Sequence, residues 1–335
     1  MFKPTTIKDI AKALNLSTST VSRALRGGYE ISEETKKIVL DYAEKINFTR
    51  NPIALSLKER RSYSIGVVVC EVANPFFSQA INGIESIAYN KGYHVIISQT
   101  HDKYSREVIN TEHLANRSVD GLLISMSAET KDYSHIEKLH KQGLPIVFFD
   151  RILKDIDTYK VISNNFQGAY NATEFLAKQG CKNIAHIANA QQLSITEDRK
   201  KGYEKALLDN GLLVDESMIK YCEHGGDNRE EVESAIEDLL NRENKPDGIF
   251  VASDRLSIGC LTAIKKHSDG VNPLIAGFSN SEVVSLLKPS ISSVMQPAFE
   301  MGRKAAELLI DIIESKYPIE TFETFVLDTS FYVNE

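Results

Sequence analysis

The chain lacks most of the features that mark secreted, membrane-bound or metal-binding proteins. Its 335 residues include four cysteines and no tryptophan. The cysteines form no CxxC pair, so we expect neither a disulfide framework nor a zinc site. No stretch approaches the ~20 apolar residues of a membrane span, and the N-terminal MFKPTTIKDI does not resemble a signal peptide. We therefore expect a cytoplasmic protein.

Motifs of the common enzyme classes are also missing. The sequence has no GxxxxGKS or GxxxxGKT phosphate loop, no GxGxxG after a strand, no HExxH and no GxSxG. Asp150 and Asp254 are candidates for a catalytic pair of carboxylates, but ligand binding or helix capping explains both of them better. We expect no enzymatic activity, no cofactor and no metal.

Charge is distributed unevenly along the chain. The whole sequence has 39 Lys and Arg against 46 Asp and Glu, a net charge of −7. Residues 1–61 carry 12 basic and 7 acidic residues, a net charge of +5, which leaves −12 for the remainder. A basic N-terminal segment suits contact with phosphate, while an acidic body stays soluble and off the nucleic acid.

The basic segment begins with two short helices. Thr6 is a good N-cap, and Ser17 is a good N-cap for a second helix after an interruption at Asn15 and Leu16. Apolar residues recur at three- and four-residue spacing in both segments: Ile7, Ile10, Ala11 and Leu14, then Val21, Ala24 and Leu25. Two helices joined by so few residues predict a helix-turn-helix, whose second helix can enter the major groove of DNA.

The second helix would present its N-terminal side chains to base edges. We expect Thr18, Ser19 and Arg23 to point there, with Arg23 suited to a bidentate guanine contact. Thr20 and Ser22 could bind phosphate. The alternative is that these residues are solvated polar groups on an exposed helix. Ser32, Glu33 and Glu34 then begin a third helix with a core-facing stripe: Thr35, Ile38, Tyr42, Ala43 and Ile46.

With these helices in place, the sequence strongly resembles the LacI/GalR family of repressors. The resemblance rests first on TIKDIAKALNLSTSTVSRAL and NPIALSLKERRSYSIGVVV, and it extends over essentially the whole chain. Further matching segments are NPFF, DGLLIS, PIVFFDR, ISNNFQGAYNATEFL, ASDRLSIG, AGFSN, VMQP and MGRKAAELL. The resemblance implies a homodimer that binds palindromic operator DNA and responds to a small-molecule effector, since a two-fold protein reads a palindromic site.

The segment NPIALSLKERRS could form little more than two helical turns, which are unstable alone in water. The resemblance implies a hinge helix that folds when paired with its dimer mate on DNA, where Leu57 wedges into the minor groove and Ala54 lies at the helix pair. The alternative is that Leu57 is buried against the next domain. The residues expected on DNA are thus Thr6, Thr18, Ser19, Thr20, Ser22, Arg23, Asn51, Ala54 and Leu57.

From residue 64 the chain alternates short apolar runs with longer amphipathic ones, which predicts repeated βαβ units. SIGVVVC, HVIISQT, DGLLISM and PIVFFD are expected strands of a first lobe, and the pattern restarts with YKVISNN, NIAHIAN, DGIFVAS and LIAGFS. We predict an all-α helix-turn-helix head and an α/β body of two doubly wound parallel-sheet lobes. The resemblance implies a periplasmic-binding-protein-like body in which the chain crosses between the lobes three times.

The expected domains are a DNA-binding domain at 1–48, a hinge helix at 49–61 and an effector-binding and dimerisation domain at 62–335. The first lobe is expected at about 62–160 and 292–320. The second lobe is expected at about 161–291 and 321–335, and the strand ETFVLDTS lies within these last residues.

Ligands of open α/β sheets bind beyond the carboxyl ends of the strands, so polar residues that follow strands are the candidates. Arg199 matches the family arginine that holds the effector, and its planar fork suits bidentate contact. Capping offers another explanation for Asn74, Ser253 and Asp254. The residues expected at the effector are Asn74, Phe76, Phe77, Ser125, Asp150, Arg151, Asn165, Ser194, Arg199, Asp227, Ser253, Asp254 and Ser279.

Two features leave the effector open. Phe76 and Phe77 are either core residues or a stacking platform for a sugar or base. Ser279 and Asn280 stand where many family members have an aspartate that binds ligand. We expect a sugar or sugar derivative, with a nucleobase or a protein corepressor as alternatives within the family. A sugar-binding transport protein is a less favoured alternative, since it would need a signal peptide and would lack the basic head.

Overall fold

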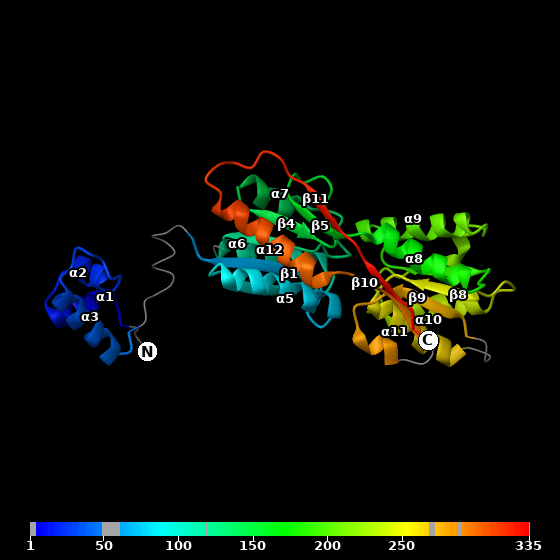
Figure 1. Cartoon of the computed structure of the whole chain (residues 1–335), viewed down its shortest axis with the longest axis horizontal. Coiled ribbons are helices and arrows are strands. Elements are labelled where there is room, and N and C mark those ends of the chain that lie inside the picture. The colour runs from blue at the N-terminus through cyan, green and yellow to red at the C-terminus, as the bar shows by residue number, and fades with distance from the viewer. Residues whose placement is uncertain (1–4, 49–60, 118, 268–271, 287–289, 335) are drawn as a thin grey trace. The chain divides into compact units, whose positions relative to one another are not determined.

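The computed structural model describes residues 5–48, 61–117, 119–267, 272–286 and 290–334, in two compact units at Met1–Ser62 and Tyr63–Glu335 (Figure 1). Each unit is considered by itself. Within the described residues, no helix is long and apolar enough to span a membrane.

The first unit contains three short helices whose starts are fixed by hydroxyl caps. They are α1 (Ile7–Leu14), α2 (Thr18–Ala24) and α3 (Glu33–Lys45). Thr6, Ser17 and Ser32 cap them as predicted, and Thr6 forms a reciprocal capping box with Asp9. The buried side chains shared by the helices are Ile10, Ala11, Val21, Ala24, Val39 and Ala43.

The buried face of α3 differs at one position from the core-facing stripe that the sequence predicts. Ile38 is 49% exposed, whereas Val39 is fully buried. Val39 lies four residues from both Thr35 and Ala43, so it shares their face of the helix, while Ile38 is turned about 100° away. Placing Ile38 in the core was therefore wrong by one position.

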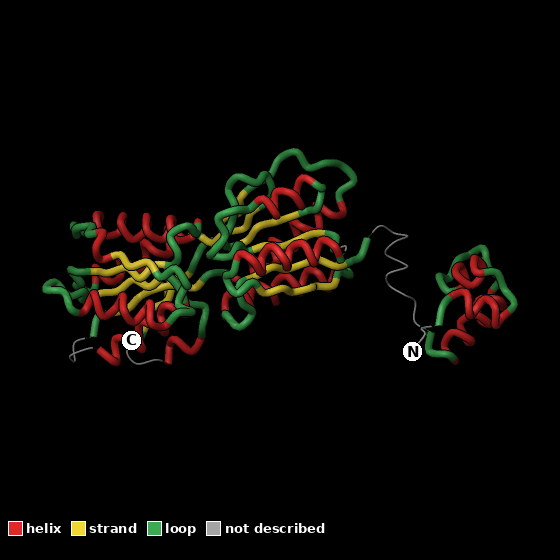
Figure 2. The backbone as a smooth tube through the Cα atoms, turned by 180° about the vertical axis from the view of Figure 1, so that it is seen from behind, coloured by secondary structure: helices red, strands yellow, loops and turns green. Residues whose placement is uncertain are grey.

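The second unit consists of two six-stranded sheets flanked by helices (Figure 2). The sheet of the first lobe has the order β11-β5-β4-β3-β1-β2, and all of its pairs are parallel. Its strands are β1 (Ser64–Val69), β2 (His94–Gln99), β3 (Gly121–Ile124), β4 (Ile146–Phe149), β5 (Lys160–Ser163) and β11 (Thr324–Leu327).

The helices of the first lobe cover both faces of this sheet. Val67 and Leu123 pack on one face with α5 and α12, whereas Val68 and Leu122 pack on the other with α6 and α7. The crossing of α5 and α12 is very close, because a Cβ on Gly302 would lie 2.0 Å from the carbonyl oxygen of Ala80. These helices are α5 (Pro75–Asn90), α6 (Tyr104–Asn116), α7 (Ser134–Lys141) and α12 (Ala298–Glu314).

The sheet of the second lobe has the order β12-β10-β9-β8-β6-β7, in which only the β10–β12 pair is antiparallel among the described strands. Its strands are β6 (Ile184–Ala188), β7 (Ile219–Tyr221), β8 (Gly248–Val251), β9 (Leu274–Phe278), β10 (Ile291–Met295) and β12 (Ser330–Tyr332). Its helices are α8 (Asn165–Lys178), α9 (Ser194–Asp209), α10 (Arg229–Leu240), α11 (Asp254–His267) and the short 3-10 helices η1 (Glu216–Met218) and η2 (Glu282–Leu286).

The predicted fold class is confirmed, but the lobe boundaries shift by several residues. β5 and β11 pair with each other in the first sheet, whereas β10 pairs with β9 in the second. The predicted bounds had placed β5 and β11 in the second lobe and most of β10 in the first. Strand pairing decides this assignment, and it depends on partners far away in the sequence. Within the described residues the chain crosses between lobes after β5, after β10 and between β11 and β12.

Candidate effector cleft and DNA-reading helix

The N-terminus of α2 presents polar side chains to solvent. Thr18 and Ser19 are exposed, and the Ser17 hydroxyl lies 2.7 Å from that of Ser19 and 2.8 Å from that of Thr20. Arg23 is also exposed and forms an ion pair with Glu30 at 3.1 Å. An exposed pair of this kind is weak, so Arg23 is free to exchange its partner for another acceptor.

The remaining predicted DNA contacts differ in position. Ser22 is partly exposed on α2, and Thr6 is exposed at the start of α1 with its hydroxyl 2.7 Å from the Asp9 carboxylate. Asn51, Ala54 and Leu57 of the predicted hinge lie outside the described residues, so their roles stay predictions.

In the second unit, Arg199 of α9 is buried against Asn165, another of the predicted effector residues. It is only 2% exposed, and its Nε donates to Asn165 Oδ1 at 2.9 Å. One Nη donates to the carbonyl oxygen of Ala252, and the guanidinium carbon lies 3.7 Å from the centre of the Phe278 ring. Burial lowers the pKa of Arg199 to about 10, an effect that the nearby Asp150 opposes, so the side chain remains a cation at neutral pH.

A second polar cluster of the same lobe surrounds Asp254. The Ser279 hydroxyl donates to one carboxylate oxygen of Asp254, and the Asn280 backbone N–H lies 3.3 Å from the other. Burial raises the pKa of Asp254, while its hydrogen bond from Ser279 lowers it. Ser253 is partly buried, with its hydroxyl 3.3 Å from Asn189 Oδ1. Many family members have a ligand-binding aspartate at the position of Ser279. Here the Ser279 hydroxyl instead forms a hydrogen bond with the neighbouring carboxylate of Asp254.

The first lobe contributes Asp150 at the end of β4. This residue is buried and has a φ of +60°, a conformation that is uncommon for an aspartate outside turns. Its carboxylate makes only long contacts with the residues that the structure describes, at 3.5 Å to Gln296 Nε2 and 3.9 Å to Arg151 Nε. Burial raises its pKa, against the lowering effect of Arg151 and Arg199.

Arg151 is bound within its own lobe. One of its Nη atoms donates to Asp102, and Asp102 also accepts the backbone N–H of Ala128 at 3.0 Å. The pair therefore ties together the segments that follow β2, β3 and β4. Sequence reasoning missed Asp102, although its position just after a strand was the signal used for the other candidates.

The other first-lobe candidates divide between cleft and core. Ser125 is fully buried, and its hydroxyl has no hydrogen-bond partner within the described residues. Asn74 caps α5, with its side chain accepting from the Phe76 N–H at 2.9 Å. Phe76 and Phe77 belong to the first-lobe core and are 5% and 2% exposed. The structure thus favours the core interpretation of both phenylalanines.

Direct contacts hold the two lobes together around this cleft. Gln79 of α5 and Asn280 exchange two hydrogen bonds, at 2.8 and 3.1 Å. Arg255 of α11 forms ion pairs with Glu71 of the first lobe and with Asp227, the latter at 2.7 Å. The predicted residue Asp227 therefore binds, within the second lobe, the arginine that joins the lobes through Glu71, and its side chain is largely exposed.

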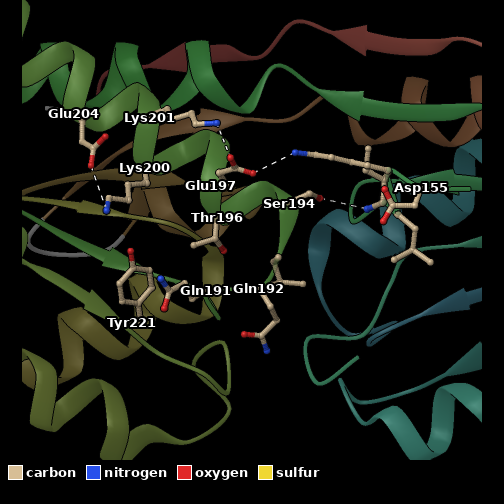
Figure 3. A pocket seen from close by; sticks show the side chains of 14 residues that line it. Asp155, Gln191, Gln192, Ser194, Thr196, Glu197, Lys200, Lys201, Glu204 and Tyr221 are labelled. Atoms are coloured by element: carbon tan, nitrogen blue, oxygen red, sulfur yellow. Dashed lines mark hydrogen bonds and ion pairs between the residues drawn. The ribbon is translucent and has the colours of Figure 1, made fainter. Parts of the chain in front are cut away.

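An open groove flanks the cleft where α9 faces the loop after β4 (Figure 3). Its volume is about 590 Å³, and both lobes line it. Lys154 of the first lobe binds Glu197 of the second at 3.2 Å. The Ser194 hydroxyl accepts the Ile152 N–H at 3.4 Å, which places this predicted effector residue at the edge of the groove. No group of three or more metal-ligating side chains occurs in the parts of the chain that the structure describes.

This arrangement, an independent helix-turn-helix unit and a two-lobed body with buried polar groups at its strand ends, defines a class of DNA-binding regulator with a ligand-binding domain. Residues 6–51 match the family model of bacterial regulatory proteins of the lacI family, and residues 65–316 match that of a periplasmic binding protein domain.

Individual relatives are similar to this chain over nearly its whole length. The chain is 30% identical to catabolite control protein A of Priestia megaterium, over 91% of each chain, and 30% identical to the ribose operon repressor of Haemophilus influenzae, over 98% of each. Among solved structures, a complex of the transcriptional regulator CelR with cellobiose has a TM-score of 0.73 at 26% identity and covers 99% of both chains. The chain therefore belongs to the lacI family of bacterial regulatory proteins.

Membership of the lacI family decides between a regulator, an enzyme and a transport protein, the classes of protein that were weighed from the sequence. The chain is a transcriptional repressor that binds DNA and is regulated by ligand, and its relatives are repressors rather than enzymes. A transport protein would lack the DNA-binding unit that residues 6–51 match.

Proposed function

We propose that the chain is a homodimeric repressor, acting in the cytoplasm on the nucleoid, whose affinity for a palindromic operator is set by a sugar or sugar derivative in the cleft between its lobes. The observation that carries the proposal is the buried Arg199, held between Asn165 and the Phe278 ring. A planar donor fork fixed by its neighbours suits bidentate contact with adjacent hydroxyl groups.

The chemistry of the cleft supports a sugar. Carboxylates, amides and serine hydroxyls line it, and among the described residues Asp150 has no short hydrogen bond to its carboxylate. Groups of this kind accept and donate to hydroxyls without needing a charged ligand. Two of the similar proteins bear names that refer to sugars, a ribose operon repressor and a regulator in complex with cellobiose.

A nucleobase is the second candidate, and one observation counts against it. Recognition of a flat base favours an accessible aromatic face. Phe76 and Phe77 are packed into the core of the first lobe, and Phe278 carries the Arg199 guanidinium on its face. The cleft therefore offers polar groups for hydroxyls more readily than a stacking surface for a base.

On DNA, Thr18, Ser19 and Arg23 are proposed to read base edges, with Thr20 and Ser22 on phosphates and Leu57 as a minor-groove wedge. The exposure of the α2 N-terminus supports the first three. The two lobes are joined by the Gln79–Asn280 and Arg255–Glu71 contacts. An effector that changes how the lobes are arranged therefore also changes the position of the first lobe in each protomer. Differential binding to two lobe arrangements is the physical basis of such control.

The dimer is supported by apolar side chains on the surface of the second unit. Tyr89 of α5 is 78% exposed, and Ile96 and Ile97 are partly exposed on β2, the edge strand of the first sheet. Ile258 and Val283 are exposed on the second lobe. A β-edge with apolar side chains is a liability in a monomer, and pairing with a second copy would cover it.

The proposal is tested by thermal unfolding of the full chain with a panel of sugars, sugar phosphates, nucleobases and amino acids. A ligand at 100 times its Kd adds about 2.7 kcal/mol, which raises the Tm of a chain of this size by about 4 °C. We expect a sugar to give such a shift and Arg199→Ala to abolish it. A shift with nucleobases alone would favour the second candidate, and no shift with any sugar would contradict the proposal.

A further inference from the structure

The loop that follows α2 is hydrogen-bonded to the end of that helix. The backbone N–H of Gly28 donates to the Arg23 carbonyl oxygen at 3.1 Å, and that of Gly27 donates to the Ala24 carbonyl oxygen at 3.1 Å. These are the two bonds of a Schellman motif. Gly27 has a φ of +72°, in the left-handed region that favours glycine. The loop is therefore bound to the backbone of Arg23, the residue whose side chain is proposed to read DNA.

The far end of this loop is anchored as well. Ile31 packs against the buried side chains of the first unit, and its backbone N–H donates to the Gly28 carbonyl oxygen at 3.3 Å. Ser32 caps α3 directly afterwards. The backbone of Glu30 is thus held between Gly28 and Ile31 by contacts that also fix the helices.

The loop brings a carboxylate to the guanidinium of Arg23. Glu30 Oε2 lies 3.1 Å from one Nη of Arg23, and neither side chain has another ion pair within the described residues. A guanidinium has five N–H donors, and a bidentate contact with guanine O6 and N7 uses two of them. The Glu30 carboxylate can therefore stay bound while Arg23 contacts a guanine.

The pair contributes little to the stability of the free chain. Its two side chains are 57% and 52% exposed, and exposed ion pairs are weak. A charge pair is stronger where water is excluded, as it is where a side chain meets base edges in a groove. Arginine also loses rotamer freedom when it binds, and a neighbouring carboxylate removes part of that freedom beforehand. The effect of Glu30 is therefore expected on DNA recognition and not on folding.

We propose that Glu30 is a positioning residue for Arg23, which holds the guanidinium in the orientation that contacts guanine and restrains it from reaching other bases and phosphates. This inference rests on the proposed base-reading role of Arg23 and adds a residue outside α2 to it. A carboxylate near DNA also repels phosphate. Loss of the Glu30 charge should therefore have two opposite effects, tighter binding to random DNA and a weaker preference for guanine.

The test uses the full chain and an operator selected from random duplexes. The position that Arg23 reads is first located as the one whose base preference is lost in Arg23→Ala. Anisotropy titrations then compare guanine with the other three bases at that position. We expect Glu30→Gln to reduce the guanine preference about fivefold or more, which is the lower end of the range for a bidentate contact. Glu30→Asp, which retains the carboxylate, should retain part of the preference.

Glu33→Gln is the matched control, because it removes the same charge from the same unit, where Glu33 is paired with Lys36 at 2.6 Å. Any gain in affinity for random DNA that comes from charge alone should appear in both glutamine variants. Only Glu30→Gln should lose guanine preference. Its Tm should equal that of wild type, because the ion pair with Arg23 is exposed.

The outcomes separate this inference from the function on which it rests. A guanine preference that Glu30→Gln leaves unchanged or sharpens, or that Glu33→Gln reduces by as much, overturns the positioning role while Arg23 remains a base reader. If Arg23→Ala loses no base preference at any position, the proposed base-reading role fails, and the role of Glu30 fails with it.

Discussion

His186 of β6 should make the stability of the second lobe fall as the pH falls. The imidazole is fully buried, stacked on Phe250 with 4.5 Å between ring centres, and its Nε2 has no partner within the described residues. Burial lowers its pKa from about 6.5 to about 3, although the hydrogen bond to the Phe250 carbonyl oxygen acts the other way. The folded protein therefore holds this histidine neutral where the unfolded chain takes up a proton.

The sign and the size of this pH effect on stability follow from the linkage between proton binding and folding. A depressed pKa of a base means that the unfolded state binds more protons between pH 6.5 and pH 3, so stability is lost as the pH falls through this window. Each pH unit well inside the window costs about 1.4 kcal/mol, and the change from pH 7 to pH 5 costs about 2 kcal/mol. Asp150 and Asp254 act in the opposite direction, because burial raises their pKa and the folded state takes up their protons first.

A variant separates His186 from these other groups. Urea unfolding of the full chain, followed by circular dichroism at pH 7, 6 and 5, should show wild type losing about 2 kcal/mol more than His186→Phe over this range. Phenylalanine retains an aromatic ring between Tyr203 and Phe250 and has no proton to gain. Equal losses of stability in the two proteins would refute the reasoning. They would show that His186 is protonated to the same extent in the folded and the unfolded state.

Three further predictions concern DNA reading, packing and assembly. Arg23→Ala should weaken binding to a specific operator by about 1–3 kcal/mol more than binding to random DNA in anisotropy titrations, and an equal loss on both would remove its base-reading role. Gly302→Ala should lower the free energy of unfolding by about 2 kcal/mol or more, since its methyl group meets the Ala80 backbone at 2.0 Å. Gly259→Ala, which meets only the Val232 side chain at 3.0 Å, should cost less, and equal losses in urea titrations would contradict the packing argument. Ile97→Asp should give a monomer in sedimentation velocity if β2 lies in the dimer interface, and an unchanged dimer would exclude this strand.

The helix-turn-helix was predictable from sequence because its determinants are local. Thr6, Ser17 and Ser32 each cap the helix that begins directly after them, and a hydroxyl acts on a backbone N–H only two or three residues away. The error at Ile38 is of another kind. The apolar residues Ile38 and Val39 are adjacent, so periodicity left two possible registers, and packing against the other helices decided between them.

Contacts between distant parts of the chain in the two lobes could not be predicted from the sequence. The strand ETFVLDTS was predicted as a strand, but its partner β5 lies more than 160 residues away, and no local pattern indicates that pairing. The same holds for the site. Gln79 and Asn280 are 201 residues apart and have no motif in common, yet they bond across the lobes. Arg199 was predictable only because a family resemblance marked it, since its partners Asn165 and Ala252 come from other elements.

The most direct test of the account measures operator affinity as a function of the sugar that stabilises the chain. Fluorescence anisotropy of the full chain on an operator selected from random duplexes should show that this sugar changes the affinity about 5- to 150-fold in wild type. The change should vanish in Arg199→Ala and persist in Arg303→Ala, whose arginine is paired with Glu300 on the surface of α12. An operator affinity that does not depend on the sugar, or a full response in folded Arg199→Ala, would contradict control through the buried cluster around Arg199.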